Sequence, residues 1–127
     1  MARKNAEKFI NSERTIYMIE NKRNGKRYIG MTIDFERRKK SHYYDLRKNR
    51  HVNRKLQKDF DSGSWEDFEF RVLKKVKGLE QAAKEENRLI DYYDTVNNGY
   101  NVIRDARPTI DYKITITGGK EKWNQLT

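Results

Sequence analysis

The sequence predicts a small α/β (α+β) domain in which a three-stranded antiparallel sheet is flanked by helices. Near the N-terminus, β-favouring residues stand on both sides of an Asn-Gly pair, which is a strong signal for a β-hairpin. Apolar residues then recur at helical spacing in three segments. Between the second and the third of these, a separate stretch alternates apolar with charged residues, which is typical of a strand. The expected order is therefore β-β-α-α-β-α, followed by a short C-terminal strand or tail.

The stretch TIYMIENKRNGKRYIG is the predicted hairpin. If Asn24 and Gly25 are the two loop residues of a type I′ turn, Tyr28 lies opposite Asn21. Tyr17 and Tyr28 then point to the same face of the sheet, roughly 13 Å apart along it. A bulge or a slipped register would change this distance. The hairpin leaves open whether the two tyrosines are packing residues or part of a reaction site.

The first predicted helix follows the hairpin. Asp34 is a suitable N-cap residue, and Phe35, Arg38, His42 and Leu46 fall on one face of the helix after it. An arginine and a histidine one turn apart therefore share the side that carries the apolar anchors.

The next two elements are a shorter helix and the third strand. Val52, Leu56 and Phe60 have helical spacing, and apolar and charged residues alternate in FEFRVLKKV, at Phe68, Phe70 and Val72. Near the C-terminus, residues 110–117 form a further candidate strand.

The clearest helix runs from Leu79 to about Val96. Glu86 lies in the middle of its apolar stripe, which is made of Leu79, Ala82, Ala83, Leu89, Ile90 and Tyr93. A carboxylate among apolar positions is costly unless it is paired or binds a cation. Glu86 is therefore either a functional group or one half of a salt bridge to a nearby arginine.

Composition restricts the function further. A chain of 127 residues forms one domain with a modest core, and the absence of cysteine excludes disulfides and thiolate zinc sites. No apolar run approaches the ~18 residues of a membrane span, and the N-terminal stretch lacks the apolar core of a signal peptide. We therefore expect a soluble, cytoplasmic protein without a membrane partner.

Positive charge is concentrated in one third of the chain. The net charge is +10, and residues 21–58 contain 14 Lys and Arg but only 3 acidic residues, so that the rest of the chain is nearly neutral. Such a field favours a nucleic-acid partner through release of phosphate counterions, although a solubilising surface or a membrane-surface or ribosome-binding patch is an alternative. The candidate DNA contacts are Lys22, Arg23, Lys26, Arg27, Lys39, Lys40, Arg47, Arg50, Arg54 and Lys55.

The motifs together resemble the GIY-YIG nuclease family, most closely its homing-endonuclease branch. The tripeptides TIY and YIG, ten residues apart, are similar to the family signature, and the later motifs follow in the family's order. These are DFERR with a following histidine, KNRHVNRKLQKDF, the acid in KEENRLIDYY, and NNGYN. The resemblance extends from about Thr15 to Asn101. One position departs from it, because Thr15 stands where the family usually has glycine.

The resemblance implies roles for individual residues. Glu86 matches the family's metal-binding glutamate and would hold one divalent cation, Mg²⁺ or alternatively Mn²⁺. Arg38 would bind phosphate oxygens in the transition state. Tyr17, more than Tyr28, would deprotonate or orient the attacking water, and His42 could assist that proton transfer. His51 and Asn101 would have supporting roles. A structural or phosphate-contacting role is the alternative to catalysis for either histidine, and Asn101 would be a structural hydrogen-bonding residue.

The expected function is that of a metal-dependent DNA endonuclease of homing or nicking type, acting as a monomer or a transient dimer. A restriction-type enzyme of the same family and a non-catalytic nucleic-acid-binding module are the alternatives. The expected domains are a basic N-terminal arm or short helix (residues 1–13), a nuclease domain (14–105) and a C-terminal tail (106–127).

Overall fold

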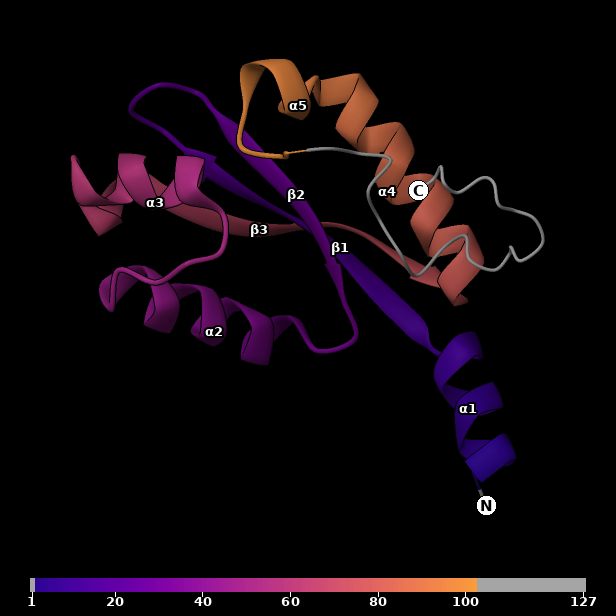
Figure 1. The fold of residues 1–127 in the computed structure, drawn as a ribbon. Helices are drawn as coiled ribbons and strands as arrows, with labels where there is room; N and C mark the ends of the chain where they lie inside the picture. The colour runs from indigo at the N-terminus through magenta and orange to yellow at the C-terminus, as the bar shows by residue number, and fades with distance from the viewer. Residues whose placement is uncertain (1, 103–127) are drawn as a thin grey trace.

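The computed structural model describes residues 2–102, and the expected strand at residues 110–117 and the tail at 106–127 lie outside this range. The elements, in order, are α1 (Ala2–Asn11), β1 (Glu13–Asn21), β2 (Arg27–Thr32), α2 (Phe35–Arg47), α3 (Arg54–Asp61), the 3₁₀ turn η1 (Trp65–Asp67), β3 (Phe68–Lys77), α4 (Leu79–Tyr93) and α5 (Thr95–Asn98) (Figure 1). None of the helices in this part of the chain is long and apolar enough to cross a membrane.

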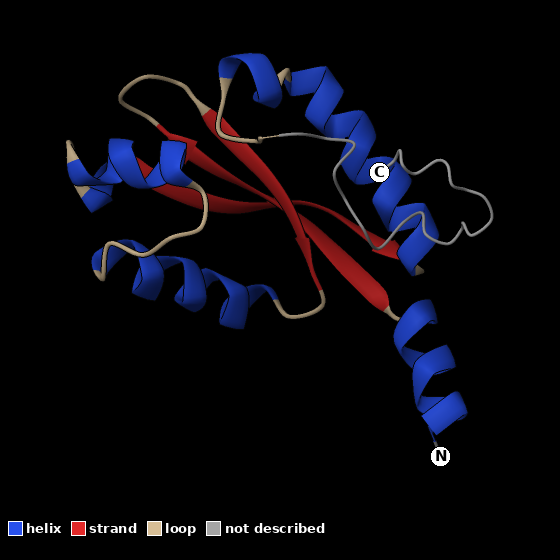
Figure 2. Cartoon of the chain, viewed as in Figure 1, coloured by secondary structure: helices blue, strands red, loops and turns tan. Residues whose placement is uncertain are grey.

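The three strands form one antiparallel sheet in the order β2-β1-β3, with helices on both faces (Figure 2). On one face, Tyr17 and Ile19 of β1 belong to a core cluster with Leu46 of α2 and Leu56 of α3. On the other face, Ile16 and Met18 of the same strand pack with Ile29, Leu89 and Ile90. The predicted fold class and element order are confirmed. Because side chains alternate along β1, its successive residues face α2 and α3 on one side of the sheet and α4 on the other.

The predicted hairpin register is wrong by two residues. Tyr28 pairs with Ile19 instead of Asn21, and Tyr17 pairs with Gly30. A shift of two residues keeps every side chain on its face, so the shared face of the two tyrosines is confirmed. The shift also brings the rings together, because their centroids lie 6.3 Å apart rather than the expected 13 Å.

The shift arises in the turn, which has four loop residues instead of two. The Asn21 N–H donates to the Lys26 carbonyl at 2.9 Å, and the Gly25 N–H donates back to the Asn21 carbonyl at 2.7 Å. Of the Asn-Gly pair only Gly25 has a positive φ, 78°, whereas a type I′ turn needs two such residues.

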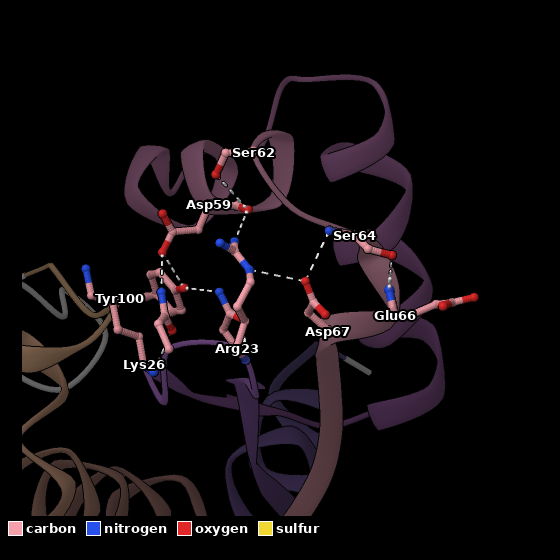
Figure 3. A network of polar contacts seen from close by, with 10 residues as sticks. Arg23, Lys26, Asp59, Ser62, Ser64, Glu66, Asp67 and Tyr100 are labelled. Carbon is pink, nitrogen blue, oxygen red and sulfur yellow. Dashed lines mark hydrogen bonds and ion pairs between the residues drawn. The ribbon is translucent and has the colours of Figure 1, made fainter.

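Polar contacts hold this turn against α3 and η1 (Figure 3). The Tyr100 hydroxyl accepts a hydrogen bond from Asn21 Nδ2 at 3.0 Å and donates to Asp59 Oδ2 at 2.7 Å. Asn24 Nδ2 donates to the same carboxylate oxygen at 3.0 Å, and Arg23 pairs with Asp67 at 3.3 Å. These partners come from distant parts of the chain, and local sequence signals at the turn therefore did not indicate its length.

Both α2 and α3 begin at capping residues. Asp34 Oδ1 accepts from the Arg37 N–H at 3.1 Å, which confirms the predicted N-cap. The second helix is capped by Asn53, whose side chain accepts from the Leu56 N–H at 3.0 Å. Val52 therefore precedes α3 and is 91% exposed, and its predicted place on the apolar face of that helix is wrong.

The apolar alternation of β3 changes phase at a bulge. Phe68 and Phe70 pack against the cluster that contains Tyr17, whereas Leu73 and Val76 pack against the opposite cluster. The register shifts opposite Ile16 and Tyr17, which inserts one extra residue into β3. Val72, the third apolar residue of the predicted alternation, pairs with Tyr17 just before the bulge and is exposed.

The last predicted helix is divided in two. It ends at Tyr93 because Asp94 adopts a left-handed conformation with φ 51°, and α5 follows directly. Aspartate tolerates this conformation better than most residues do. The predicted burial of Glu86 and of its apolar neighbours Ala82, Ala83, Leu89 and Ile90 is confirmed.

Residues that follow α5 satisfy the outer edge of β2. The Tyr100 N–H donates to the Arg27 carbonyl at 2.8 Å. The side-chain amide of Asn101 accepts from the Ile29 N–H at 2.8 Å and donates to the Ile29 carbonyl at 3.0 Å. Asn101 thus pairs with the edge strand as a neighbouring strand would.

Replacing Asn101 by alanine should destabilise the protein by about 2 kcal/mol, because both backbone groups of buried Ile29 lose their partner. Urea denaturation measures this change. Asn97→Ala is the control, since Asn97 is exposed and its side chain bonds only Asp94 among the described contacts; its effect should stay below about 0.5 kcal/mol. Equal effects of the two substitutions would contradict the proposed pairing.

Candidate active site

One cavity of about 480 Å³ collects most of the predicted site residues. It lies where β2, α2, the loop before α3, α4 and the residues after α5 meet. Six of the seven predicted residues line it: Tyr28, Arg38, His42, His51, Glu86 and Asn101. Residues more than 70 positions apart in the sequence therefore share one cavity.

Tyr17, the seventh, lies behind the cavity wall. It is 1% exposed, and its ring packs against those of Tyr28 and Phe35. The Tyr17 hydroxyl is 2.7 Å from His42 Nε2. Burial raises the pKa of Tyr17 above its ordinary value and the charges of Tyr28 and Glu86 add to this effect, whereas Arg38 lowers the pKa. The phenol therefore holds its proton firmly in the protein alone.

The Tyr17 ring lies directly over Gly30, its partner on β2. A Cβ atom at Gly30 would come within 2.5 Å of both Cζ and the hydroxyl oxygen of Tyr17. The glycine that ends the YIG tripeptide is therefore required by this close approach, not by an unusual backbone conformation.

The two histidines of the chain are hydrogen-bonded in series behind Tyr17. His42 Nδ1 is 2.7 Å from His51 Nε2, and the Asn53 N–H donates to His51 Nδ1 at 3.0 Å. The two ring planes are nearly parallel, at 14°, with 5.0 Å between centroids, and both side chains are buried. Burial lowers the pKa of His42 to about 3, an effect to which the charges of His51 and Arg38 add. Burial also lowers the pKa of His51, and both rings are therefore neutral near pH 7.

Sequence reasoning missed two residues that hold this histidine pair. Gln57 is fully buried in α3, and its Oε1 accepts from the His51 N–H at 3.0 Å. Asn53 supplies the backbone N–H that fixes the His51 ring. An asparagine just before a helical pattern is a recognisable N-cap signal, but nothing local shows that its backbone contacts a histidine.

Arg38 and Glu86 reach the cavity from opposite sides of the sheet. Arg38 is on α2 and remains exposed, whereas Glu86 is on α4 and is only 5% exposed. Their cavity therefore offers a cation and a carboxylate to one ligand. The described residues contain no group of three or more His, Cys, Asp or Glu that could hold a metal ion. A single carboxylate lining a cavity with room for waters fits Mg²⁺, which is commonly held by one or two carboxylates, waters and substrate phosphate.

The predicted DNA contacts do not all lie at the cavity. Lys22, Arg23 and Lys26 lie on the β1–β2 turn, whereas Lys40 and Arg47 line a second cavity with Tyr43, Tyr44 and Trp65. Arg54 and Lys55 are close to the first cavity, because their side chains donate to the carbonyls of His51 and Asn101. Three of the ten predicted cations form ion pairs with acidic residues in the described part of the chain; the pairs are Arg23–Asp67, Arg27–Glu20 and Arg50–Asp45.

Comparisons with known proteins agree with this fold. Residues 13–101 match the GIY-YIG catalytic domain family. Intron-associated endonuclease 1 of Enterobacteria phage T4 is 38% identical over 88 residues, which make up 68% of this chain but only 36% of that relative. The chain thus corresponds to about a third of the relative's length.

Two solved structures are similar to the chain. The catalytic domain of the homing endonuclease I-TevI has a TM-score of 0.66 and 34% identity, covering 71% of this chain and 98% of that one. A glutamate-to-alanine mutant of the catalytic domain of intron endonuclease I-TevI has a TM-score of 0.67 and 33% identity, covering 72% and 95%. The matched family and the similar structures define the fold as that of a nuclease domain. The chain belongs to the GIY-YIG family.

Thr15, the departure from the family signature, occupies an ordinary strand position. It lies in the central strand between Thr32 and Lys75 and is 8% exposed. A β-branched residue suits such a position. The fold therefore accommodates threonine where the family usually has glycine.

Gly30→Ala should destabilise the protein by about 1–3 kcal/mol, because the new methyl group overlaps the ring of buried Tyr17. Urea denaturation measures this loss. Gly63→Ala is the matched control, since the atoms nearest to its methyl group belong to the far ends of the exposed Arg23 side chain and of the Asp67 side chain, which can shift, rather than to a buried ring. A Gly30→Ala protein as stable as the Gly63→Ala protein would show that the ring does not depend on this contact.

Proposed function

We propose that this chain is a divalent-metal-dependent DNA endonuclease that hydrolyses a phosphodiester bond by water attack. The observation that carries the proposal is the convergence of Arg38, Glu86 and the tyrosine–histidine network on one cavity. Family membership and the strongly basic 21–58 segment support a DNA substrate. The similar proteins are named as endonucleases, among them homing and intron endonucleases, which favours the homing or nicking type over a restriction role.

Tyr17 is the proposed general base. Its phenolate would take a proton from the attacking water, after which the oxygen of that water bonds to phosphorus. The P–O3′ bond then breaks, and the leaving 3′ oxygen gains a proton from solvent. Tyr28 lines the cavity, and its place there supports a role in orienting the water or the phosphate.

Arg38 is the proposed phosphate ligand. Its guanidinium is exposed at the cavity and also lowers the pKa of Tyr17. A planar guanidinium can donate two hydrogen bonds to non-bridging phosphate oxygens as negative charge grows on them. Arg38 would therefore bind the transition state more strongly than the ground state.

Glu86 is the proposed ligand of a single divalent cation, Mg²⁺ or Mn²⁺. When bound, the cation would supply positive charge to the leaving 3′ oxygen and offset the carboxylate charge that raises the Tyr17 pKa. The burial of Glu86 among apolar residues of α4 fixes its position at the cavity. One site of this kind cuts one strand, so a double-strand break requires a dimer or two successive binding events.

Removing either the carboxylate or the metal should abolish cleavage. Supercoiled plasmid should be cut with Mg²⁺ and left intact with EDTA, and Glu86→Gln should lower the rate at least 100-fold, because the neutral amide no longer attracts the cation. Gel electrophoresis follows the conversion to nicked and linear forms. Glu80→Gln, on an exposed part of α4, is the control and should cut normally. Persistent DNA binding without cleavage across several substrates would favour the non-catalytic binding module.

Arg38→Ala should lower the cleavage rate at least 100-fold and change DNA affinity less than threefold, because only one of many cations is lost. Plasmid cleavage and fluorescence anisotropy with a labelled duplex measure the two quantities. Arg37→Ala removes the same charge from the neighbouring exposed position, where Arg37 contacts Asp34, and should cut normally. A parallel loss of binding and cutting in Arg38→Ala would contradict the transition-state role.

A further inference from the structure

We infer that His51, oriented by the backbone N–H of Asn53, is a positioning residue that makes His42 a hydrogen-bond donor to Tyr17. The inference rests on the proposed function for its catalytic meaning. Its structural part rests on three contacts in series, from Asn53 to His51, from His51 to His42, and from His42 to Tyr17.

The direction of the series is set at its first contact. A backbone N–H can only donate, and the Asn53 N–H is 3.0 Å from His51 Nδ1. His51 Nδ1 must therefore be the unprotonated nitrogen that accepts. A neutral imidazole has one N–H, which in His51 is then located on Nε2.

The second and third contacts follow from the first. His51 Nε2–H donates across 2.7 Å to His42 Nδ1, which must be unprotonated. The His42 proton is then on Nε2, which is 2.7 Å from the Tyr17 hydroxyl oxygen. His42 is therefore the donor in this contact, and the Tyr17 oxygen is the acceptor.

Charged forms of the two rings do not fit these contacts. A protonated His51 would direct Nδ1–H at the Asn53 N–H, and a protonated His42 would direct Nδ1–H at the Nε2–H of His51. The charged groups that act on His51 are Asp45, which raises its pKa, and Arg38 and Arg54, which lower it; burial also lowers it and is the largest effect. The neutral state agrees with these influences.

The series is fixed from outside the rings. Gln57 Oε1 accepts from the His51 N–H at 3.0 Å, and Arg54 Nη1 donates to the His51 carbonyl at 3.1 Å. The Asn53 side chain caps α3 and also donates to the Tyr100 carbonyl at 2.5 Å. These contacts fix the backbone that carries the His51 ring, and turning the ring over would break its own contacts with the Asn53 N–H and with His42.

This direction changes the role of His42. A ring whose Nε2 already bears the proton cannot take the proton of Tyr17, and the assistance in proton transfer expected for His42 does not fit the series. It instead donates to the phenolate, which lowers the cost of forming it. The Tyr17 proton leaves to solvent, the phenolate later takes the proton of the attacking water, and His42 stays neutral throughout.

Nitrogen NMR tests the inference directly, because the chain contains only two histidines. Long-range ¹H–¹⁵N spectra of the full, ¹⁵N-labelled chain at neutral pH distinguish Nδ1–H from Nε2–H in each ring. The matched variants are His51→Gln, whose amide can donate to His42, and His51→Glu, whose carboxylate can only accept. Circular dichroism checks that both are folded.

In the unaltered chain we expect both histidine rings to carry their proton on Nε2. In His51→Gln, His42 should keep its proton on Nε2. In His51→Glu, His42 should instead carry a proton on Nδ1, which donates to the new carboxylate. Cleavage should fall less than tenfold in His51→Gln and at least 100-fold in His51→Glu, in kcat rather than KM. Nδ1–H on His42 of the unaltered chain, or an unchanged His42 tautomer in folded His51→Glu, would overturn the inference. If His51→Glu does not fold, the other two spectra decide. The spectra are recorded without DNA. If the chain shows the expected tautomers but cuts no DNA, the proposed function is overturned and the inference about the histidines stands.

Discussion

The hydrogen bond between Tyr17 and His42 is the contact on which the site depends. It joins the central strand of the sheet to α2, and it forms because Gly30 has no side chain to displace the Tyr17 ring that lies over it. The same ring is part of the core cluster that holds α2 and α3 on this face. The packing of the core therefore also fixes the position of the Tyr17 hydroxyl group, and the polar residues around it have little freedom to move independently of the fold.

The periodicity of the sequence was sufficient to predict those features that depend on a single strand, hairpin or helix. The shared face of Tyr17 and Tyr28 follows from alternation along strands, and the burial of Glu86 follows from its place among apolar residues at helical spacing. The N-cap Asp34 was also readable, since it depends on a residue three positions away. Each of these predictions uses geometry that repeats within a single strand, hairpin or helix.

Features that depend on two distant segments could not be predicted in this way. The four-residue turn is stabilised by Tyr100 and Asp59, and the direction of the histidine series is set by a backbone N–H at the start of α3. The bulge in β3 is likewise visible only once β1 is beside it. The predicted distance between the two tyrosines was therefore wrong, although the sheet face that they share was predicted correctly.

The pairing of Asn101 with Ile29 also determines how short a working domain can be made. Asn101 both covers the edge of β2 and lines the cavity, and its neighbour Tyr100 holds the turn. Removing these two residues would expose strand edge to other copies of the chain and invite aggregation. A minimal version for fusion to a DNA-binding module must therefore extend through residue 101, and its linker should begin after that point.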